Sequence, residues 1–318
     1  MNRILVLQHG FQVVRMNSEL LIIMHRRNIV LATALFAGGL IALWLFLPPN
    51  ISSSAQVSNS AEAIARGEYL ITAGGCISCH RGQTEKTSEA LSGGLALETD
   101  FGIFYAPNIT PDEQTGIGNW QATDFIAALK HGRTPSGNFY YPAFPYRAYA
   151  GLSDEDVLDM AAYLLSLEPV SYAALQPKLP AWLFRWTVAG WNKMADLSQP
   201  SQEQFEDEML ARGAYLARNL GHCGECHTPR NDMGIPDFTR EYAGAEIGEE
   251  VIEAIDAEAL EEWTTNNFDI FLLLGLKPEG EFVGGDMNEV IEHNTSKLTD
   301  EDRDALAAFF TRHHAIED

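Results

Sequence analysis

The first long apolar stretch of the chain covers residues 28–47 and contains no charged residue. At about 1.5 Å of rise per residue, a helix of this length spans the roughly 30 Å hydrocarbon core of a bilayer. Arg26 and Arg27 precede the stretch, and cations beside a spanning helix stay in the cytoplasm. The pattern predicts a single-pass anchor at 28–47 in the inner membrane of a bacterium. It also predicts a cytoplasmic segment at 1–27 and a periplasmic remainder.

A cleaved signal peptide is the alternative to this anchor. The small residues Ser53, Ser54 and Ala55 would form its cleavage site. The apolar part of a signal peptide usually has about 7–15 residues, which is shorter than the stretch at 28–47. The length therefore favours an uncleaved anchor.

After a polar linker at 48–60, the same order of apolar and polar positions occurs twice. An Ala-Arg-Gly segment followed by Tyr-Leu begins at Ala65 and again at Ala211, and each leads into a pair of cysteines. Near its end each copy has an N-cap residue, Ser153 or Thr299, with an acidic residue three positions later. Two tandem helical domains are predicted, at 61–168 and 209–318.

The middle of each copy keeps a constant register of 143 positions. Strand signals are sparse throughout, so the predicted class is all-α. The connector at 169–208 is rich in proline and aromatic residues and is too apolar for a free tether. We expect it to pack on one or both domains, with contact to a membrane surface as the alternative. The residues in register are Trp120 with Trp263, Phe125 with Phe268, Gly132 with Gly275, Pro135 with Pro278, Gly137 with Gly280, and Phe139 with Phe282.

Acidic residues dominate the charge of the chain. Its 318 residues include 44 Asp and Glu against 21 Lys and Arg, for a net charge of -23. Such a charge repels phosphate backbones and argues against a nucleic acid partner. It is compatible with docking to a basic protein, and equally with a role in solubility alone.

The four cysteines form two Cys-x-x-Cys-His motifs, which are the strongest chemical signal in the sequence. Cys76 and Cys79 precede His80, and Cys223 and Cys226 precede His227. In this motif both thiols form thioethers to haem and the histidine ligates iron. Thioredoxin-like redox chemistry, structural zinc and disulfides are the alternatives. Because the motif occurs twice at equivalent points, we expect two covalently bound haem c groups.

The axial iron ligands are predicted to differ between the two haems. His80 and His227 are the proximal ligands, and we expect residues just after each motif to hold their second ring nitrogen. Met287 is the predicted sixth ligand of the second haem. The repeat places Phe144 at the equivalent position, and phenylalanine cannot ligate iron. The first haem is therefore five-coordinate or uses another donor, with His131 as first choice among His131, Tyr140, Tyr141, Tyr146, Met160 and Met194.

Three segments resemble the cytochrome c subunits of membrane-bound alcohol, aldehyde and gluconate dehydrogenases. They are Pro107-Asn-Ile-Thr-Pro111 with the following Thr115-Gly-Ile-Gly118, then Tyr141-Pro-Ala-Phe-Pro-Tyr146, and finally Cys226-His-Thr-Pro-Arg-Asn231. The resemblance implies a class I cytochrome c fold for each domain. It also implies electron transfer from a dehydrogenase subunit toward the quinone pool or an oxidase, or to another cytochrome. In that family the second segment carries Met where this chain has Phe144.

Two functions remain open at this point. The first is an anchored electron carrier without catalytic residues of its own. The alternative is a catalytic cytochrome of the thiosulfate dehydrogenase type, in which the first haem has a site accessible to a small molecule. Phe144 motivates this alternative.

Overall fold

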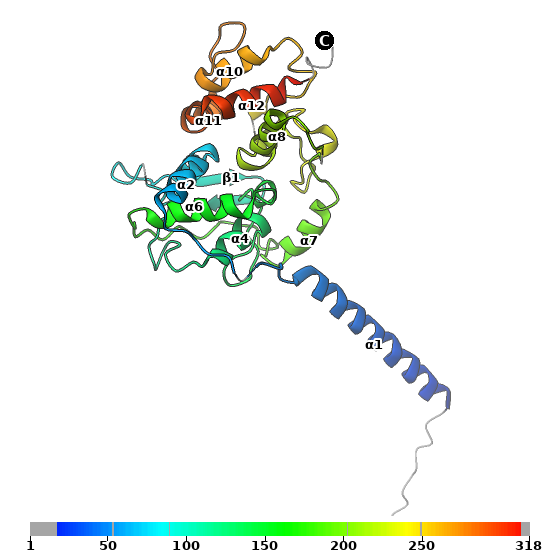
Figure 1. Ribbon diagram of the computed structural model, residues 1–318. Coiled ribbons are helices and arrows are strands. Elements are labelled where there is room, and N and C mark those ends of the chain that lie inside the picture. The colour runs from blue at the N-terminus through cyan, green and yellow to red at the C-terminus, as the bar shows by residue number, and fades with distance from the viewer. Residues whose placement is uncertain (1–17, 53, 89, 202, 249, 313–318) are drawn as a thin grey trace, which may run out of the picture. The chain divides into compact units, whose positions relative to one another are not determined.

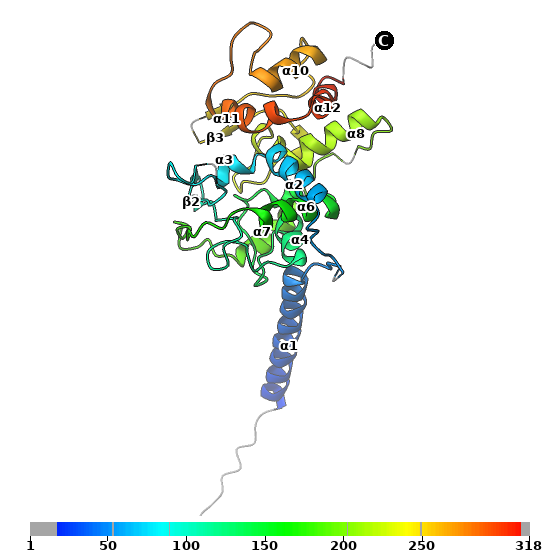
Figure 2. The same cartoon turned by 60° about the vertical axis from the view of Figure 1, so that its left-hand side comes forward.

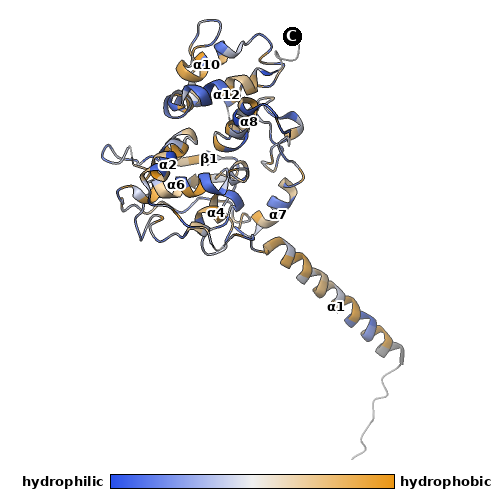
Figure 3. Cartoon of the chain, in the orientation of Figure 1, coloured by the Kyte–Doolittle hydropathy of each residue, from blue (hydrophilic) through white to orange (hydrophobic). Residues whose placement is uncertain are grey.

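The N-terminal apolar stretch forms one long helix, α1 (Ser18–Phe46). The computed structural model describes residues 18–312 except positions 53, 89, 202 and 249, so residues 1–17 and the cleavage-site residue Ser53 lie outside the described residues. Among those described, α1 is the one helix long and apolar enough to cross a membrane. It begins ten residues before the predicted span at 28–47, and the colours of Figure 3 mark most of its residues as hydrophobic, with a short hydrophilic stretch.

Residues after Leu47 form a helix-rich body in which the two sequence copies contact each other (Figure 1). The first copy contains α2 (Ala61–Ala73), α3 (Cys76–His80), β1 (Ala96–Thr99), β2 (Gly102–Tyr105), α4 (Ala122–His131), α5 (Tyr146–Tyr149) and α6 (Asp154–Ser166). The connector contains α7 (Thr187–Ala195). The second copy contains α8 (Glu208–Tyr215), a π-helical turn η1 (Leu216–Leu220), α9 (Gly224–His227), η2 (Phe238–Arg240), β3 (Ala245–Ile247), β4 (Glu250–Ile252), α10 (Thr265–Leu274), α11 (Gly285–His293), η3 (Thr295–Lys297) and α12 (Asp300–Phe310).

Two short hairpins make the prediction of an all-α class correct only in part. Strands β1 and β2 pair antiparallel from Ala96 opposite Tyr105 to Thr99 opposite Gly102. Strands β3 and β4 pair antiparallel in the corresponding part of the second copy. Each strand has only three or four residues, which is too short for the alternation of apolar and polar residues that identifies strands in a sequence.

Both copies are built around the same close helix crossing. α2 packs on α6 at Gly67, and α8 packs on α12 at Gly213. A Cβ atom at Gly67 would lie 1.9 Å from the carbonyl oxygen of Asp159, and one at Gly213 would lie 2.0 Å from that of Ala305. Only glycine allows the two backbones to approach this closely.

We expect Gly213→Ala to destabilise the protein, because the added methyl group overlaps backbone that cannot rotate away. Overpacking of this kind usually costs about 1–3 kcal/mol of unfolding free energy. The matched control is Gly190→Ala in α7, where no atom lies within 4 Å of the added Cβ. Denaturant unfolding of both variants checks the prediction, and equal midpoints for the two would contradict it.

Equivalent residues of the two copies also make equivalent core contacts. Trp120 meets Phe125 edge-on at 5.2 Å, and Trp263 meets Phe268 edge-on at 5.7 Å. The predicted N-caps are confirmed, because the hydroxyls of Ser153 and Thr299 accept the backbone N–H three residues later. The register of 143 positions therefore reflects repeated structure.

The connector packs on both copies through α7. Tyr146 of the first copy donates a hydrogen bond to Asn192 at 2.7 Å. Trp191 donates from its ring nitrogen to the carbonyl of Met233, in the second copy, at 2.8 Å. Val188 and Ala189, in the first turn of α7, are buried. This agrees with the expectation that the segment is not a free tether.

Candidate functional site

Each Cys-x-x-Cys-His motif lies on a single helical turn. α3 carries the first motif, while Cys223 caps α9, which carries the rest of the second. None of the four cysteines forms a disulfide. Burial raises the pKa of the Cys76 and Cys223 thiols to about 12. A redox dithiol needs a cysteine with a lowered pKa, so this environment argues against thioredoxin-like chemistry.

The two motif histidines are held in the same way. Nδ1 of His80 donates to the carbonyl of Pro107 at 2.8 Å, and Nδ1 of His227 donates to that of Glu253 at 2.7 Å. A carbonyl can only accept, so the proton lies on Nδ1 and the lone pair of Nε2 is available to a metal. The expectation that residues just after each motif provide this contact is wrong. The carbonyls come from the segments after the β1–β2 and β3–β4 hairpins.

The loops that carry Phe144 and Met287 have the same backbone hydrogen bonds. Tyr140 N–H donates to the carbonyl of Gly132, and Val283 N–H, 143 positions later, donates to that of Gly275, both at 2.8 Å. In each case the accepting glycine ends a helix in the left-handed conformation. Phe144 and Met287 therefore lie at equivalent points of the two copies, with Met287 in the first turn of α11.

Phe144 is packed in a cluster of tyrosine rings. Its ring centre lies 5.5 Å from that of Tyr140, 5.8 Å from that of Tyr149 and 6.4 Å from that of Tyr146. Tyr149 in turn meets the His222 ring edge-on at 5.6 Å. The position that would carry a thioether in the first copy is thus filled by aromatic carbon.

Of the other donors considered for the first haem, His131 is the exposed last residue of α4. Partial burial of the ring and the adjacent Lys130 lower the pKa of His131, whereas the Asp154 carboxylate acts to raise it. None of the described contacts brings it to the first motif, so its role stays a prediction. Met160 is only 1% exposed and belongs to the core.

The second copy contains an apolar cavity of ≈ 340 Å³. It reaches Glu253, whose carbonyl holds His227, and is lined mainly by Ile255, Leu260, Trp263, Phe268 and Phe271. Tyr242 lines a second pocket of the structure, and its buried hydroxyl has no hydrogen-bond partner among the described residues. The apolar lining of the larger cavity, next to the carbonyl that holds His227, fits a flat apolar group that Cys223 and Cys226 would hold covalently.

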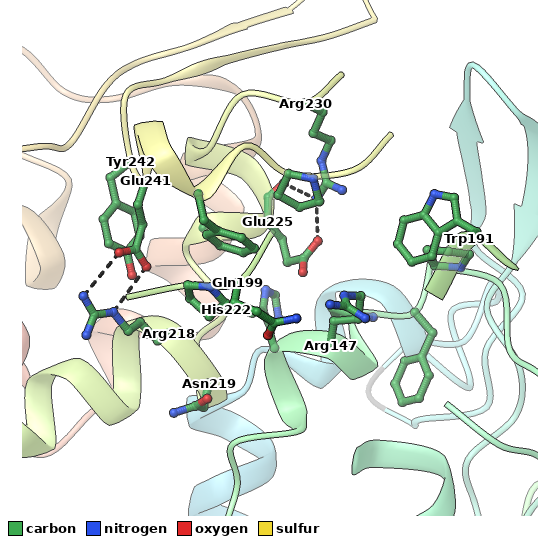
Figure 4. A pocket seen from close by; sticks show the side chains of 18 residues that line it. Arg147, Trp191, Gln199, Arg218, Asn219, His222, Glu225, Arg230, Glu241 and Tyr242 are labelled. Atoms are coloured by element: carbon green, nitrogen blue, oxygen red, sulfur yellow. Dashed lines mark hydrogen bonds and ion pairs between the residues drawn. The ribbon is translucent and has the colours of Figure 1, made fainter. Parts of the chain in front are cut away.

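A smaller pocket, ≈ 50 Å³, lies where the connector and both copies meet (Figure 4). Arg218 forms a buried ion pair with Glu241 at 3.2 Å, and Arg230 pairs with Glu225 of the second motif. His222 adopts φ 43°, where the first copy has Gly75 at φ 62°. Sequence reasoning missed these residues. The one sequence signal was the difference between Gly75 and His222, the residues directly before the two motifs.

The first motif lies at the boundary between the copies, against α11 of the second copy. Arg81, directly after the first motif, pairs with Glu289 of α11 at 2.9 Å. A Cβ at Gly75 would lie 3.1 Å from the side-chain nitrogen of Asn294. Figure 2 shows α3 beside α11, in agreement with these contacts. Burial raises the pKa of Cys226 in the second motif, and Cys79 of the first motif adds to this, so the two motifs lie near each other.

A reciprocal pair of hydrogen bonds, here named the Tyr–Asp clasp, joins the copies. Tyr69 on α2 donates to Asp302 on α12 at 2.5 Å, and Tyr215 on α8 donates to Asp156 on α6. The hydroxyls of Tyr69 and Tyr215 each also accept a backbone N–H at 3.3 Å, from Thr299 and Ser153 respectively. In the repeat, Tyr69 is equivalent to Tyr215 and Asp156 is equivalent to Asp302. The contact therefore has approximate two-fold symmetry.

Comparisons with known proteins agree with this geometry. The cytochrome c family matches residues 64–168. A diheme cytochrome c-type protein of Cereibacter sphaeroides is 40% identical over 300 residues, which is 92% of this chain and all of that relative. The chain belongs to the cytochrome c family. Covalent haem c and electron transfer follow from this membership.

Other relatives of this cytochrome c are larger. The gluconate 2-dehydrogenase cytochrome c subunit of Pantoea cypripedii is 36% identical over 77% of this chain and 58% of the relative. The cytochrome c subunit of the quinone-dependent alcohol dehydrogenase of Gluconobacter oxydans is 33% identical over 83% of this chain and 57% of the relative. This cytochrome c thus matches just over half the length of each. The resemblance to dehydrogenase cytochrome subunits is confirmed.

Proposed function

We propose that this cytochrome c carries two haem c groups, in tandem class I domains at 61–168 and 209–318, and transfers electrons between proteins. The proposal rests mainly on the equivalent environments of His80 and His227. In each, Nδ1 donates to a backbone carbonyl, which leaves Nε2 available to bind iron. Bound haem supplies a one-electron Fe(III)/Fe(II) couple. The cysteines of each motif would fix its position, and the hydrogen bond from Nδ1 to a carbonyl leaves Nε2 of each histidine able to bind the iron.

The predicted partner that donates electrons is a dehydrogenase subunit. Relatives that are named as cytochrome subunits of gluconate, fructose and alcohol dehydrogenases support this assignment. The acceptor is the quinone pool, an oxidase or another cytochrome. We further propose that α1 anchors the chain in the bacterial inner membrane with both haem domains in the periplasm, because α1 is long and apolar and follows the positive-inside pattern.

Haem content tests the central proposal. The purified chain is expected to contain two haems per polypeptide by the pyridine haemochrome assay. Cys223→Ser combined with Cys226→Ser is expected to retain one, because those thiols form the thioethers of the second motif. Val251→Ser, at a side chain that is 78% exposed on β4, is the control and is expected to keep both. A single haem in the unmodified chain would overturn the proposal.

A catalytic cytochrome is the second candidate function, and the packing around Phe144 favours it. No side chain with a donor atom occupies that loop position, so the iron of the first haem would be open to a small ligand unless another residue binds it. Carbon monoxide added to the reduced protein separates the two functions. A spectral change equal to one haem supports the catalytic cytochrome, whereas no change supports a carrier with two six-coordinate haems.

A further inference from the structure

The first part of the connector, residues 169–195, has a charge opposite to that of the whole chain. No Asp or Glu occurs between Glu168 and Asp196, while Lys178, Arg185 and Lys193 lie within this stretch. The chain as a whole has a net charge of -23. An anionic surface is therefore repelled by most of the protein and attracted here, whereas a basic partner would prefer the remaining surface.

The same stretch presents its large apolar side chains to solvent. Trp182 is 62% exposed, Phe184 51% and Trp186 63%, and the rings of Phe184 and Trp186 are stacked 6.1 Å apart. Lys178 and Arg185, close to them in the sequence, are also exposed. We name these five residues the connector surface. Tryptophan and phenylalanine beside basic residues are typical of surfaces that enter the headgroup region of a bilayer.

The connector surface is held on a fixed backbone, so its exposure is not a consequence of a loose loop. Lys178 exchanges both backbone hydrogen bonds with Ile103 of β2, at 2.9 and 3.0 Å. The guanidinium of Arg185 donates to the carbonyl of Phe139 at 2.8 Å. The apolar rings therefore point outward from a well-supported segment.

The length of the linker keeps this surface near a membrane. Only residues 47–60 separate the end of α1 from the start of α2. A fully extended chain covers at most about 3.3–3.6 Å per residue, so the linker reaches roughly 50 Å. Tethering at this range gives even a weak surface a high effective concentration at the bilayer.

We propose that the connector surface docks on the anionic phospholipid headgroups of the membrane that holds α1. The rings of Trp182, Phe184 and Trp186 enter the interface, and Lys178 and Arg185 contact the phosphates. Docking here fixes which faces of the two haem domains point toward the membrane and which toward a soluble partner. The inference rests on the proposed anchor.

A spin label on the connector surface tests the proposal in the full chain. All four native cysteines lie in the haem motifs, so Trp186→Cys provides the single free thiol of the haem-loaded protein. Met209→Cys, at an α8 position that is 52% exposed, is the control. In bilayer discs with phosphatidylglycerol, collisions of the label at 186 with a water-soluble nickel complex are expected to fall several-fold relative to 209. Lys178→Gln is expected to weaken this protection.

The outcomes of this experiment separate docking from anchoring. Equal nickel accessibility at 186 and 209 in anchored protein would overturn the proposal and leave the connector surface to a protein partner. If intact mass shows that the native protein lacks α1, the anchor fails. The same labels are then measured on that soluble form with phosphatidylglycerol vesicles. Protection at 186 would still support docking, and its absence would reject it.

Discussion

Exchanging the residues at the two equivalent loop positions is expected to exchange the character of the two haems. Met287→Phe should remove the predicted thioether ligand of the second haem, and Phe144→Met should offer one to the first. The loops share the hydrogen bonds from Tyr140 to Gly132 and from Val283 to Gly275, so the chain approaches both positions in the same way. Met287 then lies in α11, whereas Phe144 lies in a bend before α5.

The reduction potential is the main quantity expected to change. Axial ligands set haem potentials over a range of about 0.8 V, so loss of the methionine should lower the potential of the second haem by on the order of 0.1 V or more. The charge-transfer band of methionine-ligated ferric haem should disappear at the same time. Potentiometric titration with optical detection measures both effects.

Met233→Phe is the matched control, because the Met233 residue is 45% exposed and its hydrogen bond to Trp191 of the connector is made by the backbone carbonyl, which the substitution keeps. An unchanged charge-transfer band in Met287→Phe would show that another residue ligates the second haem. In Phe144→Met, appearance of a second such band would show that the first haem lacks a strong ligand on that side. Retention of the original first-haem spectrum would show that another donor already binds there.

The sequence was sufficient for the features that depend on local spacing. The Cys-x-x-Cys-His motifs, the N-caps Ser153 and Thr299, and the 143-residue register between Trp120 and Trp263 are all short-range or repeated patterns, and the structure shows each repeated contact. The family resemblance also rested on short segments and is confirmed by the relatives.

Features that depend on chain folding were not predictable in this way. The carbonyl partners of the histidines come from Pro107 and Glu253, far from the motifs in sequence, and any residue type has a carbonyl. The hairpins were missed because β1–β4 are too short to show a period. The Tyr–Asp clasp was missed because a tyrosine and an aspartate on separate helices give no sequence signal until the two copies are placed together.

Removing the hydroxyl groups of the Tyr–Asp clasp is expected to separate the two copies. Asp302 is 7% exposed and also binds Arg212 through two hydrogen bonds of 2.7 Å, so its carboxylate needs both partners. A hydrogen bond to a charged group contributes about 1.5–3 kcal/mol. Tyr69→Phe and Tyr215→Phe should each lower the unfolding free energy by about this amount. The double variant should deviate from additivity because both act on one boundary.

Alkaline pH should have the same effect on the unmodified protein. Burial and the bond to Asp302 raise the pKa of Tyr69, and burial and the bond to Asp156 raise the pKa of Tyr215 to about 12. Because both folded pKa values exceed the unfolded value near 10, the stabilisation is complete below about pH 10. It is lost as pH rises through the folded values, and Tyr215→Phe should show a smaller loss over that range.

Denaturant unfolding as a function of pH, with small-angle scattering to detect separation of the copies, measures these effects. Tyr163→Phe is the control, because burial also raises the pKa of Tyr163 but no described hydrogen bond joins its hydroxyl to the second copy. If Tyr69→Phe and Tyr215→Phe behave like Tyr163→Phe, the clasp does not hold the copies together. If instead the copies separate while each keeps its haem, the clasp is what keeps the two motifs adjacent, and electron exchange between them depends on four side chains outside both motifs.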